Sequence, residues 1–143
     1  MTVLIWLASV SVAAVPAEPP VRYFPDPSPN APYSTATQVG EILYLAGQTG
    51  EFPDGTLPDG FDAQAKRAMA NIGAVLKARG LTFDDVFKCT VMLQNMSDWP
   101  RFNEIYVPHF KPGRLPSRSA LGASGLAGGA LIEVECWAYA GKK

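Results

Sequence analysis

Apolar side chains recur at helical spacing between residues 61 and 80. This periodicity predicts an amphipathic helix with one stripe facing the core. Asp59 or Asp62 is expected to cap the start of the helix, and Gly80 is expected to end it. The stripe consists of Phe61, Ala65, Ala68, Met69, Ile72, Val75 and Leu76.

A second, shorter helix is predicted within residues 97–110. Ser97 or Asp98 is a suitable cap, and Pro100 falls in the first turn, where its missing N–H breaks no hydrogen bond. Pro108 is expected to close the helix early. Its buried face is expected to consist of Trp99, Phe102, Ile105 and Tyr106.

Other segments alternate between apolar and polar residues as strands do. Residues 36–50 are expected to form a hairpin that turns at Gly40-Glu41. Val21–Phe24 is a candidate edge strand within the proline-rich residues 16–32. The order strand-strand-helix-strand-helix-strand-strand indicates one α+β domain, whose mixed sheet carries both helices on a single face. The alternating segments are residues 36–50, 84–94, 118–124 and 130–140.

The sheet face away from the helices is predicted to be mixed in character. This mixture is too apolar for a face that lies in water and too polar for a dry core. A subunit interface fits it, and an ordinary amphipathic sheet face is the alternative. The residues expected there are Leu43 or Tyr44, Met92 and Trp137, alternating with Lys88, Thr90, Glu133 and Glu135.

The chain contains two cysteines, Cys89 and Cys136, each in a strand-like segment. Alternation puts Cys89 on one face with Phe87, Val91 and Leu93, and Cys136 on one face with Ile132 and Val134, so both thiols are expected in the core. Two buried free thiols are the favoured interpretation, because free cysteine behaves as a small apolar residue. An exported protein would also permit a disulfide.

Residues 1–17 resemble a secretory signal peptide, with an apolar run from Val3 to Val15 and small residues before a cleavage point after Ala17. The run is too short to cross a bilayer, which takes about 20 residues. The segment before it has no Lys or Arg, so an N-terminal strand or a misassigned start codon is the alternative. The predicted organisation is a signal peptide (1–17), a proline-rich arm (18–32) and one domain (33–143). Cleavage would make the protein periplasmic or secreted and free of the membrane; without it the protein would be cytoplasmic.

Charge and composition exclude several functions. The chain has 12 basic and 13 acidic side chains, whereas a nucleic-acid-binding protein usually has a basic stripe. One histidine and two cysteines are too few for a zinc site of Cys and His ligands, and no GxSxG motif accompanies His109. No metal, phosphate-loop or nucleotide motif is present.

The remaining candidates for chemistry are Arg118, Glu133, Glu135, Tyr33 and the backbone near Gly47. A guanidinium at the start of a strand can bind a carboxylate through two hydrogen bonds, although an exposed or ion-paired arginine is the ordinary alternative. A glutamate on a half-buried sheet face can have a raised pKa and act as a general acid or base. The alternative is a glutamate that faces solvent.

Three stretches together resemble the Rid family, the RidA/YjgF-type reactive-intermediate deaminases. They are PYSTATQVGEILYLAGQTG, the helix and strand AKRAMANIGAVLKARGLTFDDVFKCTVMLQNMSDWPRFNEIY, and LPSRSALGASGLAGGALIEVECWA. The resemblance covers about residues 30–138. It implies a chorismate-mutase-like fold, a homotrimer with sites in clefts between subunits, and hydrolysis of 2-enamino and 2-imino acids to 2-keto acids and ammonia without a cofactor.

The resemblance also implies roles for individual residues. Arg118 corresponds to the arginine that binds the substrate carboxylate, and Glu133 to the glutamate that positions water. Tyr33 corresponds to the aromatic residue over the site, Gly47 to the glycine whose backbone lines the pocket, and Asn103 to the helix asparagine that lines the cleft.

The chain departs from the family pattern at several positions. Ala120 stands where many deaminating members have cysteine, but the family uses the carbonyl of that residue. Ala46 replaces a serine, and LGASGLAGG changes the cleft wall. An imine/enamine deaminase is the favoured prediction; a non-catalytic protein that binds small carboxylates, or a hydrolase for another C–N bond, is the alternative.

Overall fold

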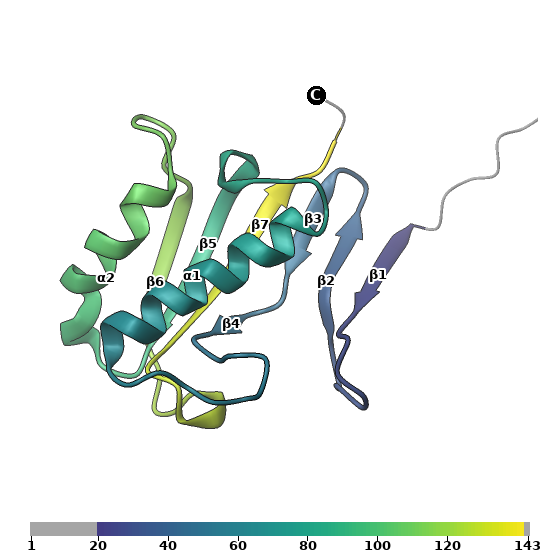
Figure 1. Cartoon of the computed structure of the whole chain (residues 1–143). Helices are drawn as coiled ribbons and strands as arrows, with labels where there is room; N and C mark the ends of the chain where they lie inside the picture. The colour runs from purple at the N-terminus through teal and green to yellow at the C-terminus, as the bar shows by residue number, and fades with distance from the viewer. Residues whose placement is uncertain (1–19, 142–143) are drawn as a thin grey trace, which may run out of the picture.

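The computed structural model of the protein describes residues 20–141, so the predicted signal peptide lies outside the described residues. Figure 1 shows the strands in one sheet, with the helices in front of it. The elements in chain order are β1 (Val21–Pro25), β2 (Ser34–Val39), β3 (Ile42–Leu45), β4 (Gln48–Thr49), α1 (Phe61–Lys77), β5 (Val86–Leu93), α2 (Trp99–Tyr106), β6 (Ser117–Gly122) and β7 (Ile132–Tyr139).

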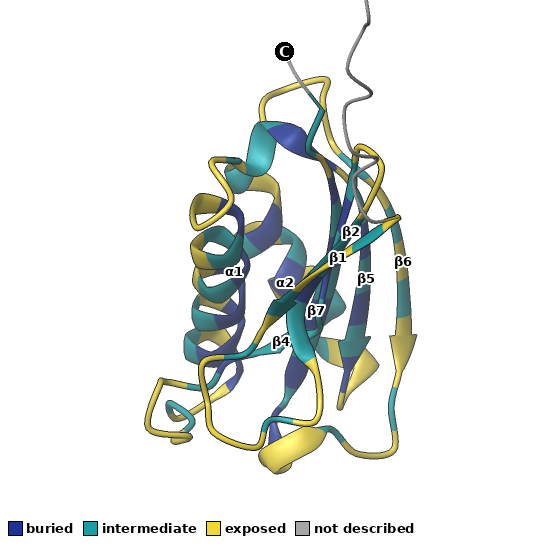
Figure 2. Ribbon diagram, turned by 90° about the vertical axis from the view of Figure 1, so that its right-hand side faces the viewer, coloured by how far each residue is buried: buried dark blue, intermediate teal, exposed yellow. Residues whose placement is uncertain are grey.

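The sheet is mixed, as the sequence predicts. Its strand order is β1-β2-β3-β7-β5-β6, with β4 paired to β7 as well. Only the pairing between β5 and β6 is parallel, among the strand pairs of the described chain. Figure 2 shows α1 and α2 on the same side of the sheet, while no helix covers the other side. We refer to these sides as the helix face and the open face.

The core lies between the helices and the helix face. Strand alternation sends every second residue of β5 and β7 into it, and the apolar stripe of α1 packs against them. Gln64 crosses this layer, because its amide accepts a hydrogen bond from the Leu131 N–H at 2.8 Å and donates one to the Pro58 carbonyl at 3.1 Å. The largest fully buried side chains include Phe102, Leu43, Met69, Ile72, Leu76, Leu93 and Ile132.

The predicted helix caps are wrong at both N-termini. Gly60 precedes α1 and no side chain caps that helix, so neither Asp59 nor Asp62 has the predicted role. Asp98 precedes α2 without a capping hydrogen bond. A short 3-10 turn at Met96–Asp98 comes first, and Asn95 caps this turn instead. The prediction for Gly80 is confirmed, since its positive φ of 71° follows the end of α1.

A bulge at the start of β5 corrects the prediction for Phe87. Val86 pairs with Ala138 and Lys88 pairs with Trp137, so the register shifts between them. The shift removes Phe87 from the core side, and its ring contacts Trp137 on the open face at 6.5 Å between centroids.

The cysteines form a disulfide, so the interpretation as two free thiols is wrong. Cys89 and Cys136 lie directly opposite each other in the register of β5 and β7, with 4.1 Å between their Cα atoms. Both residues are fully buried on the helix face. Alternation predicted the correct face for each cysteine, but the pairing depends on strand register, which alternation does not give.

No helix within residues 20–141 combines the length and the apolar character needed to cross a bilayer.

Candidate active site

Glu133 lies on the open face of β7, between the buried residues Ile132 and Val134. Its neighbours in the sheet are Thr49 of β4 and Met92 of β5. Partial burial raises the pKa of Glu133 above its ordinary value, and the negative charges of Glu135 and Glu51 raise it further. The carboxylate therefore holds a proton more readily than an exposed glutamate does.

Glu133 and Glu135 share a face but differ in their contacts. The indole Nε1 of Trp137 donates a hydrogen bond to Glu135 Oε1 at 2.8 Å. Within the described part of the chain, no hydrogen bond or ion pair engages the Glu133 carboxylate. Of these two glutamates, Glu133 is thus the one available to a ligand or a water molecule.

Gly47 makes room for the Glu133 carboxylate. A Cβ atom at position 47 would collide with Glu133 Oε1 and lie 2.8 Å from Cδ, closer than real Cβ contacts occur. Gly47 also lies between β3 and β4, two short strands that pair with successive parts of β7. The interruption of this edge at Ala46-Gly47 lets the carboxylate lie against bare backbone.

Tyr33 lies beside this position. It is 58% exposed and lines a cavity of about 390 Å³ together with Gly47, Gln48 and Thr49. A ring in this place can cover a small ligand that rests on Gly47. Tyr33, Gly47 and Glu133 form the first group of candidate site residues, which we call the glutamate half-site.

Arg118 is held by residues of α2. Its Nη2 donates a hydrogen bond to Asn103 Oδ1 at 2.6 Å. Its guanidinium carbon lies 4.6 Å from the ring centroid of Trp99 and 4.5 Å from that of Tyr106. These contacts fix the planar group in one orientation through stacking and cation–π attraction.

The other end of the guanidinium is unsatisfied. Arg118 Nη1 is buried and has no hydrogen-bond partner among the described residues, and the same holds for the Tyr106 hydroxyl. Both residues line a cavity of about 230 Å³, together with Trp99 and Leu115. Burial raises the pKa of Tyr106 to about 12, so its hydroxyl remains a donor at neutral pH. Buried donors without partners suit an anionic ligand.

Ala120 completes the second group of candidates, which we call the arginine half-site: Arg118, Asn103 and Ala120. Arg118 pairs with Cys89 and Ala120 pairs with Val91, both of which face the helices. The arginine half-site therefore lies on the helix face of the outermost strand, β6.

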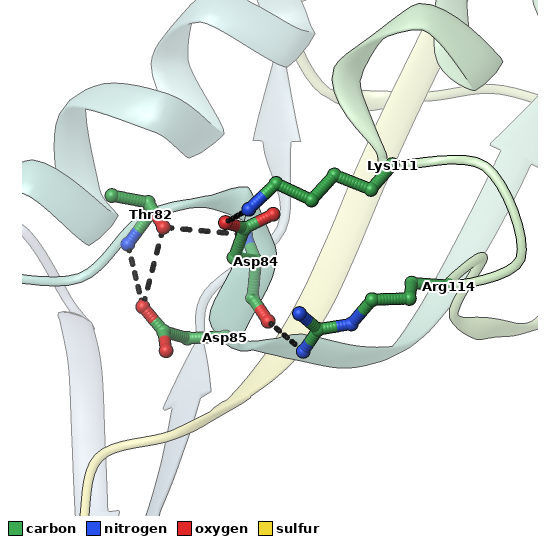
Figure 3. A network of polar contacts seen from close by, with 5 residues as sticks. All are labelled: Thr82, Asp84, Asp85, Lys111 and Arg114. Atoms are coloured by element: carbon green, nitrogen blue, oxygen red, sulfur yellow. Dashed lines mark hydrogen bonds and ion pairs between the residues drawn. The ribbon is translucent and has the colours of Figure 1, made fainter. Parts of the chain in front are cut away.

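The loop before β6 is anchored to the turn that precedes β5. Figure 3 shows Lys111 and Arg114 reaching back to Asp84, whose carboxylate pairs with Lys111 and whose carbonyl accepts from Arg114 at 3.4 Å. The Thr82 N–H donates to the Asp85 carboxylate at 2.9 Å in the same turn. These contacts fix the path of the chain into β6 and hence the position of Arg118.

The two half-sites lie on opposite faces of the sheet. Glu133 belongs to the open face, and Arg118 contacts α2 on the helix face. The sequence predicts that both residues act on one substrate, but a single copy of the chain does not bring them together. Sequence reasoning also assigned Trp99 and Tyr106 only to the core, although they clamp Arg118; their helical spacing fits both roles.

Within residues 20–141, no group of three or more His, Cys, Asp or Glu side chains is arranged to hold a metal ion.

Comparison with known proteins identifies similar chains. Residues 25–140 match the family described as Endoribonuclease L-PSP. The chain is 40% identical over 117 residues to a mouse protein named 2-iminobutanoate/2-iminopropanoate deaminase, covering 80% of this chain and 86% of the mouse protein.

Solved structures agree with the sequence match. RidA from an Antarctic Psychrobacter bacterium has a TM-score of 0.74 at 32% identity, covering 85% of this chain and 99% of that one. A Rid family protein from Yersinia pestis, YyfA, has a TM-score of 0.77 at 35% identity, covering 83% of this chain and 98% of that one.

Proposed function

Because the chain belongs to the endoribonuclease L-PSP family, the RidA/YjgF family that its sequence resembles, we propose that it hydrolyses 2-imino and 2-enamino acids to 2-keto acids and ammonia. The observation that carries the proposal is the state of Arg118, a clamped guanidinium with a buried nitrogen that has no partner among the described residues. Such a group is preorganised for a carboxylate, which every 2-imino acid has. Relatives named as imine deaminases support the same activity.

Arg118 binds the substrate carboxylate in this proposal. Arg118 Nη2 already donates a hydrogen bond to Asn103, so Arg118 Nη1 is the nitrogen that is left to bind the ligand. The rings of Trp99 and Tyr106 exclude water from one side of the guanidinium, which strengthens its charge-assisted hydrogen bonds.

Glu133 acts as the general base and then as the general acid in this proposal. Its carboxylate takes a proton from a water molecule while the water oxygen bonds to the imine carbon and the C=N electron pair moves to nitrogen. The nitrogen takes up a proton, and the C–N bond of the resulting carbinolamine breaks. The carbinolamine hydroxyl gives its proton to Glu133, which returns a proton to the nitrogen, so that ammonia leaves as the C=O bond forms. A raised pKa makes Glu133 a better proton acceptor than an exposed glutamate, which suits it to taking and returning a proton.

A homotrimer with sites between subunits follows from the same proposal. The arginine half-site of one copy would meet the glutamate half-site of another across the open face and the β6 edge. The open face supplies the apolar contacts, since Tyr44 and Trp137 pack edge to face there at 4.9 Å and Leu121 is 47% exposed.

Endonuclease chemistry on RNA is less compatible with this site, although the family description names it. A polyanion would approach Glu133, Glu135 and Glu51, whose negative charges already raise the pKa of Glu133. The net charge of the whole chain is −1, so no excess of positive charge attracts RNA. Non-catalytic binding of small carboxylates remains the main competing function, because Arg118 alone would support it.

Export from the cytoplasm is part of the proposal. The signal-like residues 1–17 and the Cys89–Cys136 disulfide support it independently, since disulfides persist in oxidising compartments. We expect the mature chain to begin near Glu18 and to occur in the periplasm or medium. Fractionation followed by N-terminal sequencing tests this, and cytosolic protein that retains Met1 would contradict it.

The proposed activity is tested with 2-iminobutanoate and 2-iminopropanoate generated in the assay by an amino-acid oxidase. Arg118→Ala is expected to lower kcat/KM roughly 30- to 1000-fold, and Arg118→Lys to remain poor because lysine lacks the guanidinium fork. Glu133→Gln is expected to lower kcat more than it weakens binding of 2-oxobutanoate.

Lys77→Ala serves as the control, because it removes an exposed positive charge at the end of α1. Thermal melts confirm that each variant is folded. A folded Arg118→Ala protein with wild-type turnover and ligand affinity would remove the basis of the proposal. Wild-type binding of 2-oxobutanoate without any imine hydrolysis would establish the non-catalytic alternative.

A further inference from the structure

A second arginine lies in the cavity of the glutamate half-site. The cavity of about 390 Å³ that Tyr33 and Gly47 line is also lined by Arg67 of α1. Arg67 precedes Asn71 by one helical turn, and the Asn71 amide donates hydrogen bonds to the carbonyls of Thr49 and Glu51 at 3.0 and 2.9 Å. This part of α1 is thereby fixed against the strand that pairs with Glu133.

Arg67 is held in place by its own contacts. Its Nε donates to the Glu51 carbonyl at 3.3 Å, and its guanidinium carbon lies 4.9 Å from the ring centroid of Phe52. In the described part of the chain, its two Nη atoms make no hydrogen bond and no ion pair. A stacked guanidinium with both Nη groups available is a preformed receptor for a carboxylate.

The cavity adjoins the reacting group. Gly47 lines it and lies against the Glu133 carboxylate, so a substrate carbon beside Glu133 has the cavity next to it. The α-carboxylate of the substrate is taken by Arg118 in the proposed function, which leaves Arg67 for the far end of the substrate. We propose that Arg67 determines specificity by binding a side-chain carboxylate, so that the preferred substrates are dicarboxylic 2-imino acids. This inference rests on the proposed function and specifies the substrate class of the same site.

Two carboxylates line the same cavity but are turned to other partners. Asp26 Oδ1 accepts the Ser28 N–H at 2.8 Å. The Glu51 carboxylate lies towards Gly128, where Oε1 is 2.5 Å from the position of an added Cβ. A substrate with a cationic side chain would have to use Glu51, whose carboxylate lies at Gly128. The free Nη pair of Arg67 makes an anionic side chain the better match.

Binding of keto-acid products tests the subsite directly. We expect calorimetry to give tighter binding of 2-oxoglutarate than of 2-oxobutanoate to the wild-type protein. Arg67→Gln is expected to weaken 2-oxoglutarate at least about 10-fold and to change 2-oxobutanoate less than about twofold. Lys66→Gln is the matched control, since Lys66 is the adjacent exposed cation on α1 and does not line this cavity. Turnover of 2-iminoglutarate and 2-iminobutanoate should follow the same pattern in kcat/KM.

The outcomes separate the subsite from the proposed function. Imine hydrolysis with no Arg67-dependent preference for the dicarboxylate overturns the subsite and leaves the deaminase intact. Arg67-dependent binding of 2-oxoglutarate without hydrolysis of either imine supports the subsite and overturns the deaminase. Tighter binding of 2-oxo-5-guanidinopentanoate than of 2-oxoglutarate, lost in Glu51→Gln, would overturn the subsite in favour of a cationic side chain.

Discussion

Gly47 illustrates how one missing side chain sets the position of a reactive group. The Glu133 carboxylate occupies the space that a Cβ at residue 47 would need. Gly47→Ala is therefore expected to leave the protein folded but to displace the carboxylate and lower kcat about 100-fold, the usual cost of misplacing a catalytic group by about 1 Å. Steady-state kinetics on purified protein measures this.

Gly125→Ala is the control for that experiment, because a Cβ there meets nothing within 4 Å. It should have the activity of the wild-type protein. Equal activity of both variants would show that the contact between Gly47 and Glu133 does not position the carboxylate for catalysis.

The charge of Glu51 gives the activity a predictable pH dependence. Glu51 is one of the groups that raise the pKa of Glu133, after burial and Glu135. Glu51→Gln removes a negative charge, so the ionised form of Glu133 becomes less unfavourable and its pKa falls. If Glu133 is the base, the acidic limb of the kcat profile should move to lower pH. Glu104→Gln on α2 should leave the limb in place, and identical shifts in both variants would contradict the assignment of Glu133.

The sequence predicts correctly which sheet face a side chain lies on, because the alternation of apolar and polar residues determines it. Alternation of Ile132, Glu133 and Val134 was enough to predict a glutamate on the open face. Arg118 was a candidate from the sequence itself and Asn103 came from the resemblance, and the structure brings the two within hydrogen-bond distance. Arg67 was not predicted, because a cation in a helix is usually solvated and only the packing of Phe52 and Glu51 against it shows otherwise.

The sequence predicts helices and strands more reliably than it predicts which residues of neighbouring strands pair. The periodic patterns predicted both helices and the main strands, because hydrophobic spacing reflects one local geometry. The bulge at Val86–Lys88, the break between β3 and β4 and the opposition of Cys89 to Cys136 all depend on register across the sheet. Register is set by contacts between strands that are distant in sequence, so local patterns do not encode it.

The disulfide ties β5 to β7 at the centre of the sheet, across a sequence separation of 47 residues. Closing a loop of this size should stabilise the protein by about 4 kcal/mol through the entropy of the unfolded chain. The double variant Cys89→Ala, Cys136→Ala is expected to lose stability of this order in urea unfolding. Thiol titration of the unreduced, denatured wild-type protein should find no free thiol, and two titratable thiols would contradict the pairing.

The whole molecule explains why the two half-sites are separated. Arg118 packs under α2 on one face of the sheet, and Glu133 lies on the other face. Two side chains that act on one small imino acid must approach within a few ångströms of it. A chain with this fold therefore completes the proposed site only by association with another copy, and the exposed apolar residues of the open face provide a surface for it.

Mixing two inactive variants tests this association and the site together. Arg118→Ala and Glu133→Gln should each form inactive homo-oligomers that sediment as trimers. After the two are unfolded together in equal amounts and refolded, random assembly should restore about one quarter of the wild-type activity, since that fraction of interfaces combines an intact Arg118 with an intact Glu133 from a neighbour. If both residues served a site within one chain, no mixture could contain an intact site and activity would stay at the level of the single variants. Arg118→Ala protein that is unfolded and refolded by itself should remain inactive. This control separates complementation from a recovery of activity caused by refolding.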